Sequence, residues 1–151
     1  MTLTELQTEA AGLTLPRFDE TTALQLGLLL TEIAKAEALP VVINIRTANR
    51  TLFHVALPGS AANNDNWARR KSNTALMFAE ASLIVGTRHR DKGEVLAKHG
   101  LSETDYADHG GAVPISVTGI GMVAVATVSG LPQREDHALV VRGLQALRAQ
   151  I

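Results

Sequence analysis

The chain has 151 residues, of which 46% are hydrophobic, so it has the length of one domain and enough apolar side chains for a substantial core. Its 14 basic and 15 acidic residues give a net charge of −1, which argues against a nucleic-acid-binding protein because phosphate recognition needs a basic surplus. The absence of cysteine excludes disulfides, thiolate nucleophiles and cysteine-based metal sites.

The N-terminal segment alternates polar and apolar residues and lacks the basic and apolar regions of a signal peptide. No apolar stretch is long enough to span a membrane. We therefore expect a cytoplasmic protein without a membrane partner. We expect a single domain over residues 1–151, in which residues 1–18 form a peripheral segment. Charged residues make up only 19%, which leaves apolar surface that a homo-oligomer would cover.

Helix signals come first along the chain. An amphipathic pattern predicts a short helix over residues 2–12. Asp19 is a suitable N-cap for a second helix over residues 20–38, which is apolar around much of its circumference and which Pro40 ends. A helix of this kind is buried on more than one side.

Alternating apolar residues predict a β-hairpin over residues 41–57. A three-residue loop at 48–50 keeps the apolar residues on one face and places Ile45 opposite Phe53. Asn44, Arg46 and His54 then share the other face. This polar set could line a cleft, or it could simply be solvated or covered by a partner.

The middle of the chain predicts two more helices. Asp65 or Asn66 is a suitable cap for a helix that runs to about Leu83. A charged helix over residues 92–99 ends at Gly100.

A second hairpin is predicted with its loop at residues 119–121, which places Val117 opposite Val123 and Ile115 opposite Val125. Both of its faces are apolar or small, as in a sheet that is covered on both sides. A final helix follows Pro132.

The order of these elements predicts an α/β (α+β) fold. We expect a single antiparallel sheet of two β-hairpins with helices packed on both faces, an α/β/α arrangement.

No sequence motif names a reaction. The serines lack the nucleophile-elbow pattern, and the glycine pairs read as tight turns because no phosphate-loop motif accompanies them. No two of the five histidines are spaced three or four residues apart, so we predict no metal site. The catalytic residues, if there are any, stay unknown at this stage.

One cluster of aromatic and basic side chains is a candidate ligand site. Trp67, Arg70 and Lys71 lie near the predicted start of a helix, where free N–H groups and the helix dipole favour an anion. The indole could stack on a ligand ring or on an arginine. Alternatively, Trp67 closes an edge of the core and the cations are solvated or paired across a subunit contact.

Three segments, residues 64–73, 106–117 and 125–141, together resemble the GlcG/HbpS-like family of haem-degrading domains, and more closely its cytosolic branch. The resemblance implies an α/β/α domain that assembles into dimers or larger rings. It also implies that haem is a possible cofactor, since some members bind and break down haem. His109 and His137 lie inside these segments and are therefore candidate haem ligands.

Three functional hypotheses follow. The first is a haem-binding or haem-degrading protein, on the strength of the resemblance. The second is a non-catalytic homo-oligomeric scaffold that binds a small molecule or a partner. The third is an enzyme that acts on a small anionic substrate through Trp67, Arg70 and Lys71.

Overall fold

The four strands of the computed structural model, which describes residues 1–151, form one antiparallel sheet in the order β2-β1-β4-β3. The strands are β1 (Val42–Arg46), β2 (Thr51–Ala56), β3 (Ala112–Val117) and β4 (Gly121–Ser129). Each hairpin supplies one central strand, so β1 pairs with β4 in the middle of the sheet. The predicted single sheet of two hairpins is confirmed.

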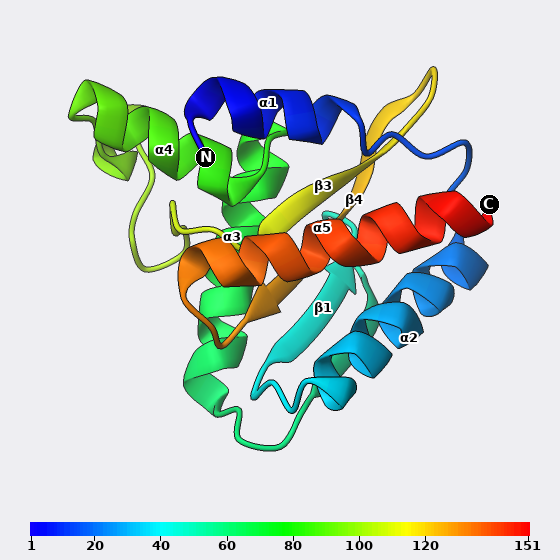
Figure 1. The fold of residues 1–151 in the computed structure, drawn as a ribbon. Helices are drawn as coiled ribbons and strands as arrows, with labels where there is room; N and C mark the ends of the chain where they lie inside the picture. Colours follow the sequence, from blue (N-terminus) through cyan, green and yellow to red (C-terminus); the bar gives the residue numbers. More distant parts are fainter.

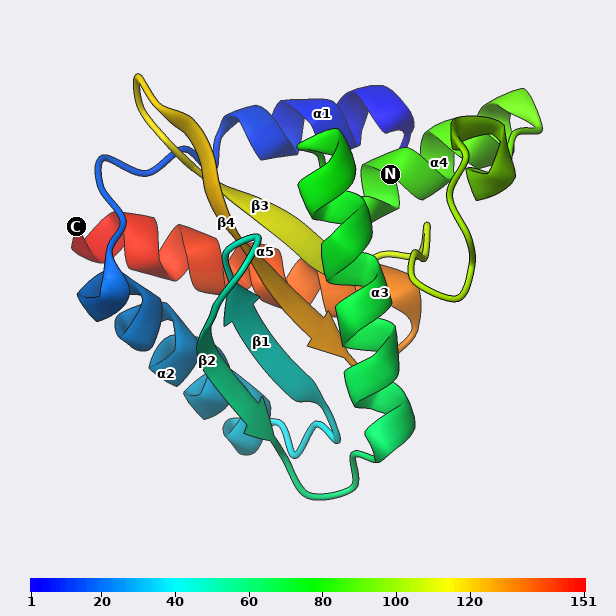
Figure 2. The ribbon, with the colours of Figure 1, turned by 180° about the vertical axis from the view of Figure 1, so that it is seen from behind.

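Helices cover both faces of this sheet. They are α1 (Leu3–Ala11), α2 (Glu20–Ala36), α3 (Ala62–Phe78), α4 (Ser82–Lys92) and α5 (Gln133–Gln150), with a 3₁₀ turn η1 (Leu96–His99) after α4. Helices α2 and α5 lie on one face (Figure 1), and α3 crosses the other face (Figure 2). The predicted three-layer arrangement is confirmed.

The first hairpin has the predicted register through most of its length. Ile45 lies opposite Phe53 and Asn44 lies opposite His54, as expected from the alternation of apolar residues. A β-bulge then pairs Arg46 with Thr51, so the predicted three-residue loop is wrong at its tip. The apolar face packs on α2, and the Phe53 ring fills the space over Gly27 where a Cβ would otherwise lie.

The predicted register of the second hairpin is wrong. Val117 pairs with Gly121 and Ile115 pairs with Ala124, with a β-bulge between Ile115 and Ser116. The turn closes one residue earlier because Gly121, with φ of 98°, already belongs to β4. Val125 therefore lies on the α3 side of the sheet, in a small apolar cluster apart from the one that contains Ile115.

The helices after the first hairpin also differ from the prediction. Helix α3 begins at Ala62, three residues before the earliest predicted cap, and it ends where Ala79 takes a left-handed conformation with φ of 53°. Helix α4 then runs through Gly86. The predicted helix over residues 92–99 is only the turn η1, although it does end at Gly100 as expected.

Gly86 lies within α4 because of packing. A Cβ at this position would clash with the carbonyl oxygen of Asp108 in the loop before β3. The glycine therefore lets this loop lie directly on the helix, and the loop carries residues of the site described below.

The first residues of the chain pack against the rest. Leu6 and Leu15 are fully buried, and Leu15 forms a parallel bridge with Val117 at the end of β3. None of the helices combines the length and the apolar character that a membrane crossing requires.

Candidate functional site

A buried lysine lies at the centre of the candidate site. Lys71 extends from α3 and its Nζ donates to the carbonyl oxygens of Gly110 at 3.1 Å and Val128 at 2.8 Å. Its third contact is a carboxylate oxygen of Asp136, at 3.1 Å. One side chain thus connects α3, the loop before β3, strand β4 and helix α5.

Asp136 completes a buried ion pair with Lys71. Burial lowers the pKa of Lys71 and raises the pKa of Asp136, which by itself favours the neutral forms of both groups. The hydrogen bonds of both groups oppose this effect. An ammonium has three N–H bonds and finds three acceptors here, and the second oxygen of Asp136 accepts from the backbone N–H of Leu131 at 2.9 Å. We therefore describe the pair as charged.

Three more accessible side chains lie beside the ion pair. The guanidinium carbon of Arg70 lies 4.3 Å from the centre of the Trp67 ring, a cation–π contact. The His109 ring meets the edge of Trp67, with 5.2 Å between ring centres. The His109 side chain is 49% exposed. These groups thus present an imidazole, an indole and a cation to the solvent side.

The ion pair and these rings line one cavity of about 240 Å³. Its walls come from α3, the loop before β3, the end of β4 and the start of α5. The lining residues are mostly polar: Asn63, Asn64, Trp67, Lys71, His109, Gly110, Ser129, Gly130, Leu131, Gln133 and Asp136. We call this cavity the polar pocket.

Asp108 contacts two histidines at the edge of the polar pocket. One carboxylate oxygen lies 2.8 Å from Nδ1 of His89, which is buried in α4. The other oxygen lies 3.5 Å from Nδ1 of His109. The Nε2 atom of His109 has no protein partner. This nitrogen is therefore available to a ligand.

His137 lies outside the polar pocket. It is buried in the first turns of α5, and its Nε2 contacts a carboxylate oxygen of Glu9 at 2.8 Å. Its Nδ1 is buried without a hydrogen-bond partner. The residue joins α5 to α1, and a ligand could reach the Nε2 atom only by displacing Glu9.

The structure thus gathers Trp67, Lys71 and His109 around one cavity, places Arg70 on the indole and leaves His137 apart. The predicted helix start at this cluster is wrong. Because α3 begins at Ala62, these residues of α3 lie inside the helix and its free N–H groups are one turn or more away.

Among the polar-pocket residues that the sequence did not single out, two make contacts that hold the pocket together. Asp136 neutralises Lys71, and the side-chain oxygen of Gln133 accepts from the N–H of Gly110 at 3.0 Å. Both are in the first turn of α5, next to Pro132. The packing of α3 across β3 and β4 brings this turn beside α3, and no local sequence pattern signals such a long-range contact.

The chain is similar in sequence to a protein family and to individual relatives. The model of the family described as "Haem degrading protein HbpS-like" matches residues 18–145. A UPF0303 protein of Paraburkholderia xenovorans (strain LB400) is 47% identical over 146 residues, which cover 94% of this chain and 88% of that protein.

Two solved structures extend this likeness to the fold. The crystal structure of the Ybr137w protein matches with a TM-score of 0.90 and 34% identity, over 98% of this chain and 88% of that one. A structure titled as the PduOC:heme complex matches with a TM-score of 0.72 over 85% of this chain and 94% of that one. Its 20% identity shows a shared fold alone.

Proposed function

Since this chain belongs to the HbpS-like family of haem-degrading proteins, we propose that it binds haem, whose iron His109 would hold at the mouth of the polar pocket. The observation that carries the proposal is the free Nε2 of a half-exposed imidazole that lies against an indole. A single axial histidine is enough to hold haem iron.

The chemistry of the donor set fits this group. His109 offers a neutral nitrogen to iron, Trp67 offers an aromatic surface to the macrocycle, and Arg70 offers a cation to the propionates. When bound, haem would supply the redox chemistry of its iron. The residues of the chain would hold it and orient it.

The size of the polar pocket sets a condition on this binding. Its volume of about 240 Å³ lies below the range of about 300–1,000 Å³ that is typical for drug-sized ligands. The pocket therefore cannot enclose a haem, and most of the macrocycle would stay outside the monomer. A haem held through His109 would be open to solvent or to a second copy of the chain.

His137 is the weaker of the two candidate ligands. Its side chain is only 6% exposed, and its Nε2 is engaged by Glu9. Ligation by this residue would require the Glu9 side chain to leave its contact with the imidazole. His109 is therefore accessible to a haem, whereas His137 is not.

A haem titration of the full chain tests the proposal. We expect a shift of the Soret band at micromolar haem, and we expect His109→Ala to abolish it. His54→Ala is a matched control, because His54 is also a partly exposed histidine beside a carboxylate, that of Asp65, but on β2. A flat titration of the unmodified chain, or an unchanged shift in His109→Ala, would refute the proposed site.

A homo-oligomeric binding protein is the second candidate function. Leu24 and Leu28 are one helical turn apart on the outer side of α2, and each is 52% exposed. Apolar residues at this spacing suit a contact between copies of the chain. Light scattering should give a mass above that of the 16.1 kDa monomer, and Leu28→Lys should reduce it. A monomer at all concentrations would contradict this function.

A further inference from the structure

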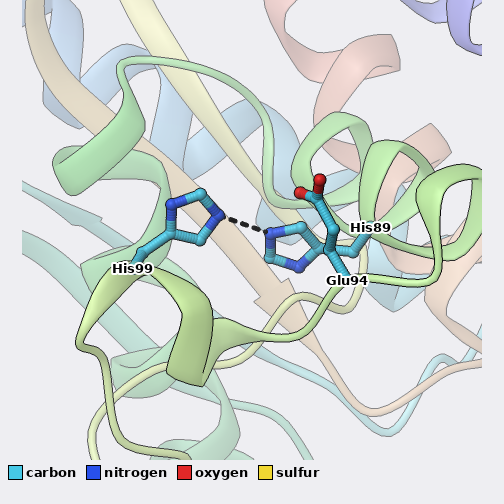
Figure 3. A group of neighbouring side chains, drawn as sticks. All are labelled: His89, Glu94 and His99. Carbon is cyan, nitrogen blue, oxygen red and sulfur yellow. Dashed lines mark hydrogen bonds between the residues drawn. The ribbon is translucent and has the colours of Figure 1, made fainter.

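A second group of histidines lies beyond the polar pocket, between α4 and η1. The Nε2 atoms of His89 and His99 lie only 3.1 Å apart and point toward each other, with the Glu94 carboxylate beside them (Figure 3). The nearest ligand atoms of these three side chains all lie within 4.8 Å of one another. We call His89, Glu94 and His99 the histidine–glutamate cluster.

The orientation of His89 is set by Asp108. A carboxylate only accepts hydrogen bonds, so its oxygen at 2.8 Å from Nδ1 requires the proton of a neutral His89 to be on that nitrogen. The lone pair of Nε2 then points at His99. Histidines that bind metals in proteins almost always have such a carboxylate or carbonyl partner on the other ring nitrogen.

The two imidazoles of the cluster differ in how tightly the protein surrounds them. His89 is 2% exposed, and the Phe78 ring meets both imidazoles edge-on, with ring centres 6.5 Å from His89 and 5.1 Å from His99. His99 itself is exposed on the short turn η1. One imidazole is therefore fixed, and the other can rotate to accommodate an ion.

Glu94 supplies a negative charge at this position. Its backbone N–H donates to the carbonyl of His89 at 2.8 Å, and one carboxylate oxygen accepts from Lys98 at 2.6 Å. The second oxygen has no partner within the protein.

We infer that the histidine–glutamate cluster is a binding site for a divalent transition metal, with Zn²⁺ as the best match. Two imidazoles and one carboxylate form a three-ligand set that Zn²⁺ uses in proteins, with a fourth position left open. Bonds of about 2.0–2.1 Å in a tetrahedral site place two nitrogens about 3.3 Å apart. The observed 3.1 Å between the Nε2 atoms is close to this value.

A bound metal would change what connects η1 to the rest of the molecule. Without it, the two imidazoles share one hydrogen bond, and Glu94 pairs with an exposed lysine. With it, one ion would join the end of α4, the loop at Glu94 and the turn η1. We expect binding to raise the thermal stability, because the folded chain alone holds the three ligands together.

A calorimetric titration of the full chain with ZnCl₂, after treatment with a chelator and in the absence of haem, tests the site. We expect one equivalent to bind and the melting temperature to rise. His99→Ala should weaken binding by more than about 100-fold, since the loss of an outer-shell partner already weakens it by about 10–100-fold. Glu94→Gln should weaken it as well, while Co²⁺ in the unmodified chain should give the visible absorption of a tetrahedral site.

Histidine variants show whether Zn²⁺ binds at this cluster or at another histidine. His99 is exposed, so its removal should leave the circular dichroism spectrum unchanged, whereas removal of the buried His89 endangers folding. His54→Ala, on β2, is a control that should bind Zn²⁺ like the unmodified chain. Absence of Zn²⁺ binding, or equal affinity in His99→Ala, would overturn the inference. Neither result bears on the haem titration, which depends on His109.

Discussion

Asp108 contacts a histidine of the polar pocket and a histidine of the histidine–glutamate cluster, and the buried polar groups of the two sites have different partners. In the pocket, the buried Lys71 finds three acceptors within its own chain. In the cluster, the Nε2 of the buried His89 finds only another imidazole. The Lys71 ammonium, with a hydrogen-bond acceptor for each N–H, therefore stabilises the fold. The two Nε2 atoms that face each other are instead suited to binding a metal ion from solution.

The largest effect on the free energy of unfolding is expected when Lys71 is replaced. Lys71→Met leaves Asp136 buried without its partner, and breaking one side of a buried ion pair destabilises a protein by about 3–5 kcal/mol. Urea denaturation should show this loss. The double variant Lys71→Met/Asp136→Leu should recover much of it, because no unpaired charge remains. A single variant as stable as the unmodified chain would contradict the structural role of the pair.

A smaller loss should follow from Gly86→Ala. The new methyl group must push the Asp108 carbonyl away from α4, and overpacking of this kind typically costs about 1–3 kcal/mol. The variant should also bind Zn²⁺ more weakly, because the displaced loop carries the Asp108 carboxylate that orients His89. Gly119→Ala, in the turn between β3 and β4, is a useful control for added volume, since a Cβ there meets no atom within 4 Å. However, its positive φ adds local strain, so only its effect on Zn²⁺ binding is compared.

Asp108→Asn should leave the fold almost unchanged and should lower the affinity for Zn²⁺. It removes the charge that holds His89 in its orientation, so Zn²⁺ affinity should fall by about 10–100-fold in a calorimetric titration. His99→Ala should have a larger effect in the same experiment. The reverse order would show that Asp108, and not His99, is the direct ligand.

The smallest effect is expected for an exposed ion pair. Arg142 donates two hydrogen bonds to Glu37, at 3.2 and 2.7 Å, on the solvent side of α5. Exposed pairs contribute little because solvent screens them. Arg142→Ala should therefore shift the urea midpoint far less than Lys71→Met does. A comparable shift would mean that burial does not explain the difference between the two pairs.

The parts of the fold that the sequence predicts are those with a strong local pattern. Asp19 caps α2 as expected, and its side chain accepts from the N–H of Thr22 at 3.0 Å. The first hairpin has one apolar and one polar face, so a register error would expose its core, and Ile45 pairs with Phe53 as predicted. The second hairpin is apolar or small on both faces. Its pattern therefore does not distinguish one register from the next.

The candidate sites were predictable to different degrees. Trp67, Lys71 and His109 could be singled out by residue type and resemblance, and they do line one cavity. His89 and His99 could not, because they are ten residues apart and their contact depends on the turn at Gly93, where φ is 65° and α4 ends. The spacing rules for metal ligands on one helix do not describe a pair that a helix end brings together.

The double contact of Asp108 has a consequence for how the two sites behave together. One carboxylate serves His89 through one oxygen and His109 through the other, at 2.8 and 3.5 Å. An ion that draws electron density from His89 strengthens the first contact, and it thereby changes the electrostatics at the second. If haem and Zn²⁺ bind as proposed, their two binding equilibria are therefore coupled. Linkage requires that haem alter the affinity for Zn²⁺ by the same factor by which Zn²⁺ alters the affinity for haem.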